Sequence, residues 1–151
     1  MINIPTLWNR DPNSILLPEE NKNRRVISKG PLINLPELQK LIKGKQIDFD
    51  NEQLWLATPK CRDDVLVKYK WEYSKIAQMI CALRPGGRAK GDYKKSEWAE
   101  VDGEDIFPCD VYGLHFDEKS GMRTENGLYI YLKFSLGVNG DLILVLVSCH
   151  V

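Results

Sequence analysis

The chain has 151 residues, 43% of them hydrophobic and 28% charged, with a formal net charge of zero. This length and composition are typical of one globular domain with a real hydrophobic core, and no stretch of about 18 apolar residues is present to cross a membrane. The first residues, MINIPTLWNRDPN, carry charge where a secretory signal would be apolar. We therefore expect the protein in the cytoplasm.

The charges are unevenly distributed along the chain. Residues 1–90 contain 16 Lys and Arg against 10 Asp and Glu, whereas residues 91–151 contain 5 against 11. Such asymmetry can indicate a surface that binds a polyanion, but charges of opposite sign often mix in space once a chain folds.

The cysteines give no indication of a metal site. They are widely separated, and no Cys-x-x-Cys pair with the spacing of zinc ligands is present. In a reducing compartment we expect them to be small buried side chains. The sequence therefore predicts neither a metal nor another cofactor. The four are Cys61, Cys81, Cys109 and Cys149.

An irregular arm is expected over residues 1–33, which contain four prolines and scattered polar residues. A short strand is predicted at residues 25–27, and the arm is expected to wrap the domain through Ile2, Leu7 and Trp8. The remaining residues, 34–151, are predicted to form the folded domain.

Three helices are expected in the first half of that domain. Asn34 is a favourable cap for a helix over residues 35–43, which has an apolar stripe and is followed by Gly44. Thr58 caps a second helix with continuing apolar periodicity to about residue 69, and a third is predicted over residues 71–83.

From Gly91 onward the apolar pattern changes to the two-residue period of strands. Strands are predicted at residues 93–99, 108–116, 127–137 and 141–150. Helices followed by a meander indicate an α+β fold, with about three helices packed on one face of an antiparallel sheet of about four to six strands. The other face of the sheet is then free for function.

The last two strands are predicted to form a hairpin over residues 128–151. Asn139-Gly140 suits a two-residue type I′ turn, which would place Val138 opposite Asp141, Tyr131 opposite Ser148 and Tyr129 opposite His150. Because side chains alternate between faces, one face is expected to be apolar and to form core. That face comprises Leu128, Ile130, Leu132, Phe134, Val145, Val147 and Cys149.

The opposite face of the hairpin gathers Tyr129, Tyr131, Lys133 and His150. One interpretation is an amphipathic hairpin whose polar side faces water. The other is a catalytic face, because histidine exchanges a proton near neutral pH while lysine and tyrosine can stabilise a developing anion. Alternation alone does not choose between them.

Five short motifs occur in an order and spacing that resemble one family over residues 34–151. They are the Leu35–Gly44 helix, Asp92-Tyr93-Lys94-Lys95-Ser96, Asp110-Val111-Tyr112, Tyr131-Leu132-Lys133-Phe134 and Val147-Ser148-Cys149-His150. The set is similar to the MqsR-type toxins of bacterial toxin–antitoxin pairs, whose fold is akin to the RelE and ParE toxins. Each motif is weak alone, and their order carries the resemblance.

The resemblance implies an mRNA interferase, a metal-independent endoribonuclease that is held inactive by a cognate antitoxin protein. Its partners would be single-stranded mRNA and that antitoxin, with no membrane. Whether it acts on the ribosome and whether it forms a homodimer stay open.

Carried over by position, the catalytic residues would be Lys95, Tyr131 and His150. In cleavage by 2′-hydroxyl attack, His150 would act as acid or base, Tyr131 would assist proton transfer or orient the phosphate, and Lys95 would stabilise negative charge. Each also has a plain structural interpretation: a frayed terminal histidine, a packed tyrosine and a solvated lysine. Lys94 replaces Lys95 if the alignment slips by one residue.

Further basic and aromatic residues are candidates for RNA binding. A glycine-bearing basic loop carries Arg84 and Arg88, which can grip phosphates but can also be solvated. Lys94, Lys133 and Tyr129 complete the predicted RNA-binding set.

Departures from the family pattern suggest a second hypothesis. Cys109 stands where the family commonly has glutamine, and a thiol cannot replace the hydrogen bonds of an amide. An acidic stretch runs from Glu97 to Glu118. The alternative is therefore a protein-binding module on the same fold with weak or no catalysis.

Overall fold

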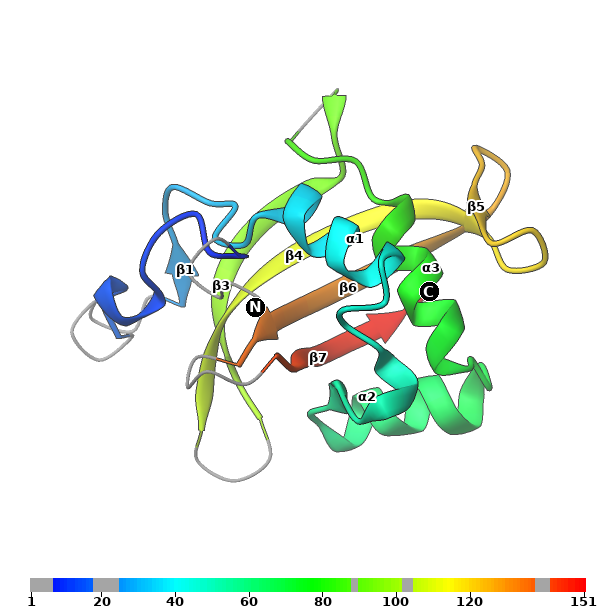
Figure 1. Ribbon diagram of the computed structural model, residues 1–151, viewed down its shortest axis with the longest axis horizontal. Helices are drawn as coiled ribbons and strands as arrows, with labels where there is room; N and C mark the ends of the chain where they lie inside the picture. The colour runs from blue at the N-terminus through cyan, green and yellow to red at the C-terminus, as the bar shows by residue number, and fades with distance from the viewer. Residues whose placement is uncertain (1–6, 18–24, 88–89, 102–104, 138–141) are drawn as a thin grey trace.

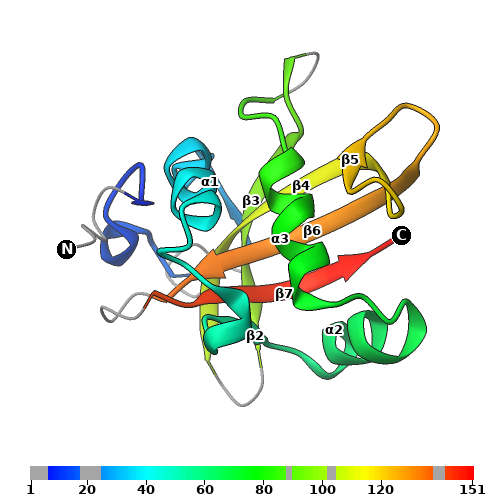
Figure 2. The same ribbon diagram turned by 45° about the vertical axis from the view of Figure 1, so that its right-hand side comes forward.

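The computed structural model describes residues 7–17, 25–87, 90–101, 105–137 and 142–151. The fold is α+β, as predicted. Helices α1 (Leu35–Lys43) and α3 (Tyr73–Ala82) lie across one face of a seven-stranded sheet (Figures 1 and 2). None of the helices in the described part of the chain is long and apolar enough to span a membrane.

The sheet is mixed rather than purely antiparallel. β2 (Leu54–Leu56) pairs with β7 (Leu144–His150) in parallel, and the other pairings are antiparallel, with β5 (Met122–Arg123) paired to β4 (Ile106–Asp117) outside the main order. The parallel strand β2 was not predicted, because three residues are too few to show a period. Across the sheet the order is β1 (Val26–Ile27), β3 (Tyr93–Glu100), β4 (Ile106–Asp117), β6 (Leu128–Leu136), β7 (Leu144–His150) and β2 (Leu54–Leu56).

The predicted helix caps are present. The Asn34 side chain accepts a hydrogen bond from the Glu37 amide at 3.3 Å at the start of α1, and Thr58 accepts from the Cys61 amide at 3.1 Å. Thr58 begins α2 (Pro59–Arg62), which continues into a π-helix over Asp63–Lys68 beside β7. The first helix has its predicted bounds, and α3 begins two residues later than predicted.

The N-terminal arm packs into the main core and is held there by a buried carboxylate. Leu7 and Trp8 are buried as expected, while Ile2 lies outside the described residues. Asp110, which is fully buried on β4, accepts hydrogen bonds from the amides of Leu32 and Ile33 at 2.9 to 3.0 Å. The hydroxyl of Ser96 donates to the same carboxylate at 2.6 Å. Asp110 therefore ties the end of the arm to the sheet.

The predicted register between β6 and β7 was wrong. Tyr131 lies opposite His150 rather than Ser148, and Lys133 lies opposite Ser148. Leu136 pairs with Leu144, so the register near the turn differs from the prediction by one residue. A bulge at Val147 then shifts the register by a second residue. The predicted turn at Asn139-Gly140 lies outside the described residues.

This shift explains which predicted core residues changed faces. A one-residue slip inverts the faces of a strand, so Leu144 and Leu146 enter the main core in place of Val145 and Val147. Beyond the bulge the two shifts together restore the predicted face, and Cys149 is buried in the main core as predicted. Leu128, at the start of β6, is 40% exposed rather than core.

The sheet face opposite α1 and α3, here called the open face, carries a small second core at one end. Val145 and Val147 are buried there with Ala57, Ala99, Val101 and Cys109. Trp55 of β2 and Phe107 of β4 meet edge to face, with ring centroids 5.9 Å apart. The other end of the open face is polar and exposed.

Candidate active site on the open face of the sheet

The centre of the polar end is a tyrosine–histidine pair on neighbouring strands. Gly113 of β4, Tyr131 of β6 and His150 of β7 are register partners and form one row across the sheet. The rings of Tyr131 and His150 stack, with centroids 5.1 Å apart and planes 20° apart. Two of the three predicted catalytic residues are therefore in direct contact.

The last residues of the chain are tied to the domain. The Val151 amide donates a hydrogen bond to the Tyr69 hydroxyl at 3.3 Å, and Tyr69 stacks on Trp71 with centroids 4.3 Å apart. His150 Nδ1 lies 3.3 Å from the Val151 carbonyl oxygen. If Nδ1 carries the proton and donates it there, Nε2 is left as a proton acceptor. A frayed terminal histidine does not fit these contacts.

The predicted catalytic lysine lies on the same face, in the row next to this pair, and interacts electrostatically with Tyr131. Lys95 belongs to the next row, which runs through Val111, Lys133 and Ser148. Three strand spacings separate Lys95 from the strand of His150, or about 14 Å across the sheet. By backbone position the nearer lysine is Lys133, which is two residues from Tyr131 on β6 and on the same face, with its Nζ bonded to Glu97 of β3. The sequence prediction had assigned Lys133 to RNA binding.

Glu97 forms an ion pair with both of these lysines. Its two carboxylate oxygens lie 2.8 Å from Lys95 Nζ and 2.5 Å from Lys133 Nζ. Partial burial opposes ionisation of Glu97, but the hydrogen bonds from the lysines outweigh it and lower the carboxyl pKa. The hydrogen bond to Glu97 in turn raises the pKa of Lys95. Both lysines are therefore paired with one carboxylate.

A bulge in β3 brings Lys94 to the open face as well. Tyr93 and Lys95 pair with the consecutive residues Tyr112 and Val111, so Lys94 is an extra residue on β3. Its Nζ lies 5.6 Å from the centroid of the Tyr129 ring. Lys94 and Lys95, the two alternatives from the sequence, are therefore both exposed and have different neighbours.

His115 was missed by the sequence analysis. It is the register partner of Tyr129, is exposed, and its ring centroid lies 4.9 Å from that of Tyr129. Alternation along β4 from Val111 through Gly113 would have placed His115 on this face. Both histidines of the chain therefore lie on the open face, each beside a tyrosine of β6.

The basic loop is only partly described. Arg84 lines a cavity of about 200 Å³ together with His115, Arg123, Thr124 and Glu125. Arg123 is held by Asp92, with nitrogen–oxygen distances of 2.5 and 3.0 Å. Arg84 is thus placed beside His115, whereas Arg88 lies outside the described residues.

Cys109 does not reach the surface of the site. It is fully buried in the second core, and burial raises the pKa of its thiol far above the usual range. In the described part of the chain Cys61 and Cys149 are also buried, and all four cysteines are free thiols.

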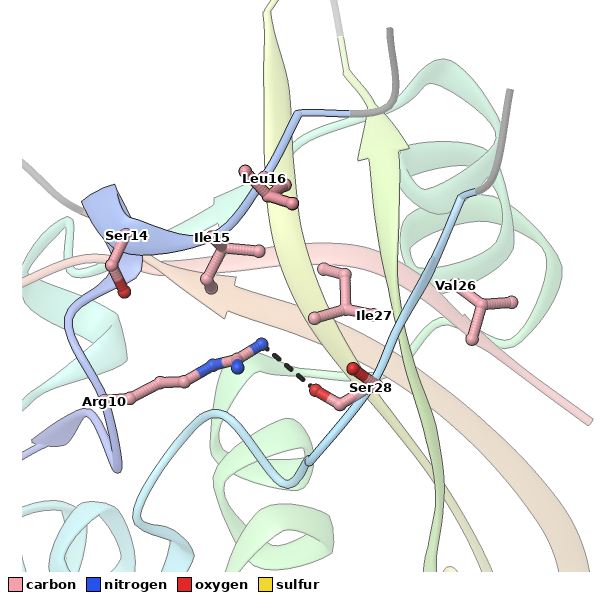
Figure 3. Close-up of a pocket in the computed structure, with 7 residues that line it drawn as sticks. All are labelled: Arg10, Ser14, Ile15, Leu16, Val26, Ile27 and Ser28. Atoms are coloured by element: carbon pink, nitrogen blue, oxygen red, sulfur yellow. Dashed lines mark hydrogen bonds between the residues drawn. The ribbon is translucent and has the colours of Figure 1, made fainter. Parts of the chain in front are cut away.

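A larger cavity, of about 370 Å³, lies between the arm and the β1 edge. Figure 3 shows Arg10 reaching across it to the carbonyl oxygen of Ser28, at 3.0 Å. Much of its remaining lining is aliphatic, from Ile15, Leu16, Val26 and Ile27. Among the described residues that line it there is no histidine or carboxylate for proton transfer, so the chemistry is sought on the open face.

Comparison of the chain with protein-family models, curated proteins and solved structures finds no match. The similarity to MqsR-type toxins therefore stays a prediction from the sequence motifs.

Proposed function

We propose that this protein is an MqsR-type toxin, an endoribonuclease that cuts single-stranded mRNA without a metal ion. The observation that carries the proposal is the stacked pair of Tyr131 and His150 on an open sheet face that also bears Lys94, Lys95 and Lys133. Its cellular setting is then the cytoplasm, with a cognate antitoxin protein as the inhibitory partner.

The proposed reaction is an internal phosphoryl transfer. The 2′-hydroxyl oxygen of the RNA bonds to the adjacent phosphorus, the bond from phosphorus to the 5′ oxygen breaks, and a 2′,3′-cyclic phosphate and a free 5′-hydroxyl result. One proton leaves the 2′-hydroxyl and one is added to the 5′ oxygen. His150 Nε2 carries out one of these transfers, solvent water carries out the other, and the Tyr131 hydroxyl orients the phosphate.

Lys133 supplies positive charge next to this pair, because it lies on the strand of Tyr131. Lys95 adds a second positive charge from β3. Its ammonium group and that of Lys133 contact the same carboxylate, that of Glu97. This modifies the sequence prediction, in which Lys95 was the cation at the phosphate. Stabilisation of developing phosphoryl charge is the role proposed for this lysine pair.

The test is cleavage of single-stranded RNA by the purified protein in EDTA. Positioned proton transfer contributes roughly 10²- to 10⁴-fold, so His150→Ala is expected to slow cleavage by about that factor. Lys40→Ala, on the exposed side of α1 at the opposite face of the sheet, is the control and should cut like the wild type. Equal rates for wild type and His150→Ala would remove the catalytic role.

A second candidate function is a protein-binding module on the same fold, and the Glu97 bridge favours it. A carboxylate between Lys95 and Lys133 reduces the positive charge available to RNA. This candidate predicts tight association with a protein partner while expression of the chain alone leaves growth and message levels unchanged. Loss of growth that His150→Ala relieves would instead favour the toxin.

A further inference from the structure

The open face carries a second aromatic position beside the proposed catalytic pair. Tyr129 is 41% exposed and precedes Tyr131 by two residues on β6, so both rings are on the same face. His115 and Lys94 flank the Tyr129 ring on β4 and β3. The exposed ring is thus bracketed by an imidazole and an ammonium group.

Gly113 allows the Tyr129 ring to lie over the sheet. A Cβ atom at this position would collide with the Tyr129 hydroxyl and would come within 3.2 Å of Lys94 Cε. Because no side chain stands at Gly113, the tyrosine can lean across β4 towards Lys94. Its ring lies over backbone in the middle of the sheet.

This second position is separate from the proposed catalytic pair. His115 and His150 lie on strands either side of β6 and in neighbouring rows. With strands about 4.8 Å apart and about 3.4 Å per residue, their Cα atoms are about 12 Å apart. Each imidazole lies against its own tyrosine, which puts His115 beside a different position of a bound strand from His150.

We propose that Tyr129, His115 and Lys94 form a base-stacking subsite for the nucleotide next to the cleaved phosphate. The inference rests on the proposed ribonuclease function and adds where the substrate is held. An unpaired base stacks on the exposed tyrosine in place of the Lys94 ammonium group, which lies over the ring and then turns to contact a phosphate.

The spacing of the two tyrosines suits an unstacked single strand. Their backbone positions are about 6.8 Å apart along β6, whereas bases in a duplex strand follow one another about every 3.4 Å. An RNA with a base on Tyr129 and its cleaved phosphate at the Tyr131 hydroxyl therefore has that base turned out of the stack. Opening the stack also lets the 2′-hydroxyl move in line with the leaving 5′ oxygen.

The cavity next to His115 continues this path beyond Tyr129. Its lining includes Arg84, Thr124 and Glu125 along with His115 and Arg123, and its volume of about 200 Å³ is open to a further polar group of the RNA. The path of the strand would then run from β7 across β6 and β4 towards Arg84.

An abasic scan tests the subsite. The substrate is a short single-stranded RNA with one mapped cleavage site, compared with copies that lack one base at each position around it. Base stacking on an aromatic side chain contributes about 5- to 150-fold. For the wild type, removal of the base next to the cleaved phosphate should lower kcat/KM by roughly tenfold or more.

Tyr129→Leu should remove this sensitivity to the missing base, so that intact and abasic substrates are cut equally. Tyr129→Phe retains the aromatic ring and should retain the sensitivity. Met122→Leu, an exposed residue of β5, serves as a control that leaves the scan unchanged. Cleavage with an unaltered scan in Tyr129→Leu would overturn the subsite alone. If the wild type cuts no RNA, the proposed function and the subsite are both overturned.

Discussion

Replacing Glu97 by glutamine is expected to strengthen RNA binding, because it frees two lysines at once. The carboxylate contacts Lys95 at 2.8 Å and Lys133 at 2.5 Å, and only the latter lysine is mostly buried, with 14% of its side chain exposed. Glutamine keeps the shape of the side chain and removes its charge. Both ammonium groups then lose the carboxylate that competes with phosphates for them.

The size of the effect follows from the number of lysines released. For single-stranded nucleic acid, each phosphate neutralised by a lysine contributes about 0.7 to the slope of log affinity against log salt. Two lysines give a steeper slope by up to about 1.4. If affinities converge near 1 M salt, the variant binds up to about 25-fold more tightly at 0.1 M.

The assay is fluorescence anisotropy over a salt series, using single-stranded RNA whose 2′-hydroxyls are methylated so that it cannot be cut. Glu100→Gln is the matched control, since Glu100 is also on β3 but is exposed and pairs with Arg25 at 3.1 Å. Equal slopes and affinities for wild type and Glu97→Gln would refute the view that this carboxylate competes with RNA.

The same substitution has a pH-dependent effect on stability. The lysines depress the folded-state pKa of Glu97 below its ordinary value near 4.5, so its stabilising contribution is present above that pH. That contribution is lost as pH falls through the depressed value. Urea unfolding should show Glu97→Gln less stable by about 1 to 3 kcal/mol at neutral pH, with the difference from wild type shrinking in acid. A difference that is constant with pH would contradict the assignment.

Two further substitutions test the packing that supports the site. Asp110→Ala should lower the free energy of unfolding by about 3 kcal/mol or more, because the amides of Leu32 and Ile33 lose their buried acceptor; a loss under about 1 kcal/mol in urea unfolding would contradict the anchoring role. Tyr112→Phe should leave stability unchanged or raise it by about 1 kcal/mol, because the buried Tyr112 hydroxyl has no hydrogen-bond partner among the described residues. A lower urea midpoint would show that this hydroxyl is satisfied.

The helices were predictable because their signals are local. Asn34 and Thr58 each accept the capping hydrogen bond that their sequence positions suggest, and the apolar stripe of the first helix is buried. The open face was also predictable, since Tyr131 and His150 share it in both the predicted and the observed register. An even shift in register preserves the face on which a side chain lies.

The register itself depended on features that a local pattern does not encode. The bulge at Val147 and the shift of Leu144 exchange which residues of β7 enter the main core. Val145 and Val147 are apolar in either arrangement, because the open face has a second core of its own. Alternation therefore gave no sign that they had changed sides.

The electrostatics of the site depended on tertiary pairing in the same way. Glu97 and Lys133 are 36 residues apart in sequence and meet only because β3 and β6 flank β4. From the sequence Glu97 was the beginning of an acidic stretch, and its contact with two lysines could not be read from charge counts. The position of His115 on the open face, by contrast, could have been predicted from the alternation of side chains along β4.

The central claim is that the open face cuts RNA by 2′-hydroxyl attack with His150 transferring a proton. The most direct measurement is mass spectrometry of the products from one RNA, and from its copy with a single 2′-deoxy residue at the cleaved nucleotide, after incubation with the purified protein in EDTA. The account predicts a 2′,3′-cyclic phosphate and a 5′-hydroxyl from the first, and an uncut second. No cleavage of the first RNA, or equal cleavage of both, would contradict it.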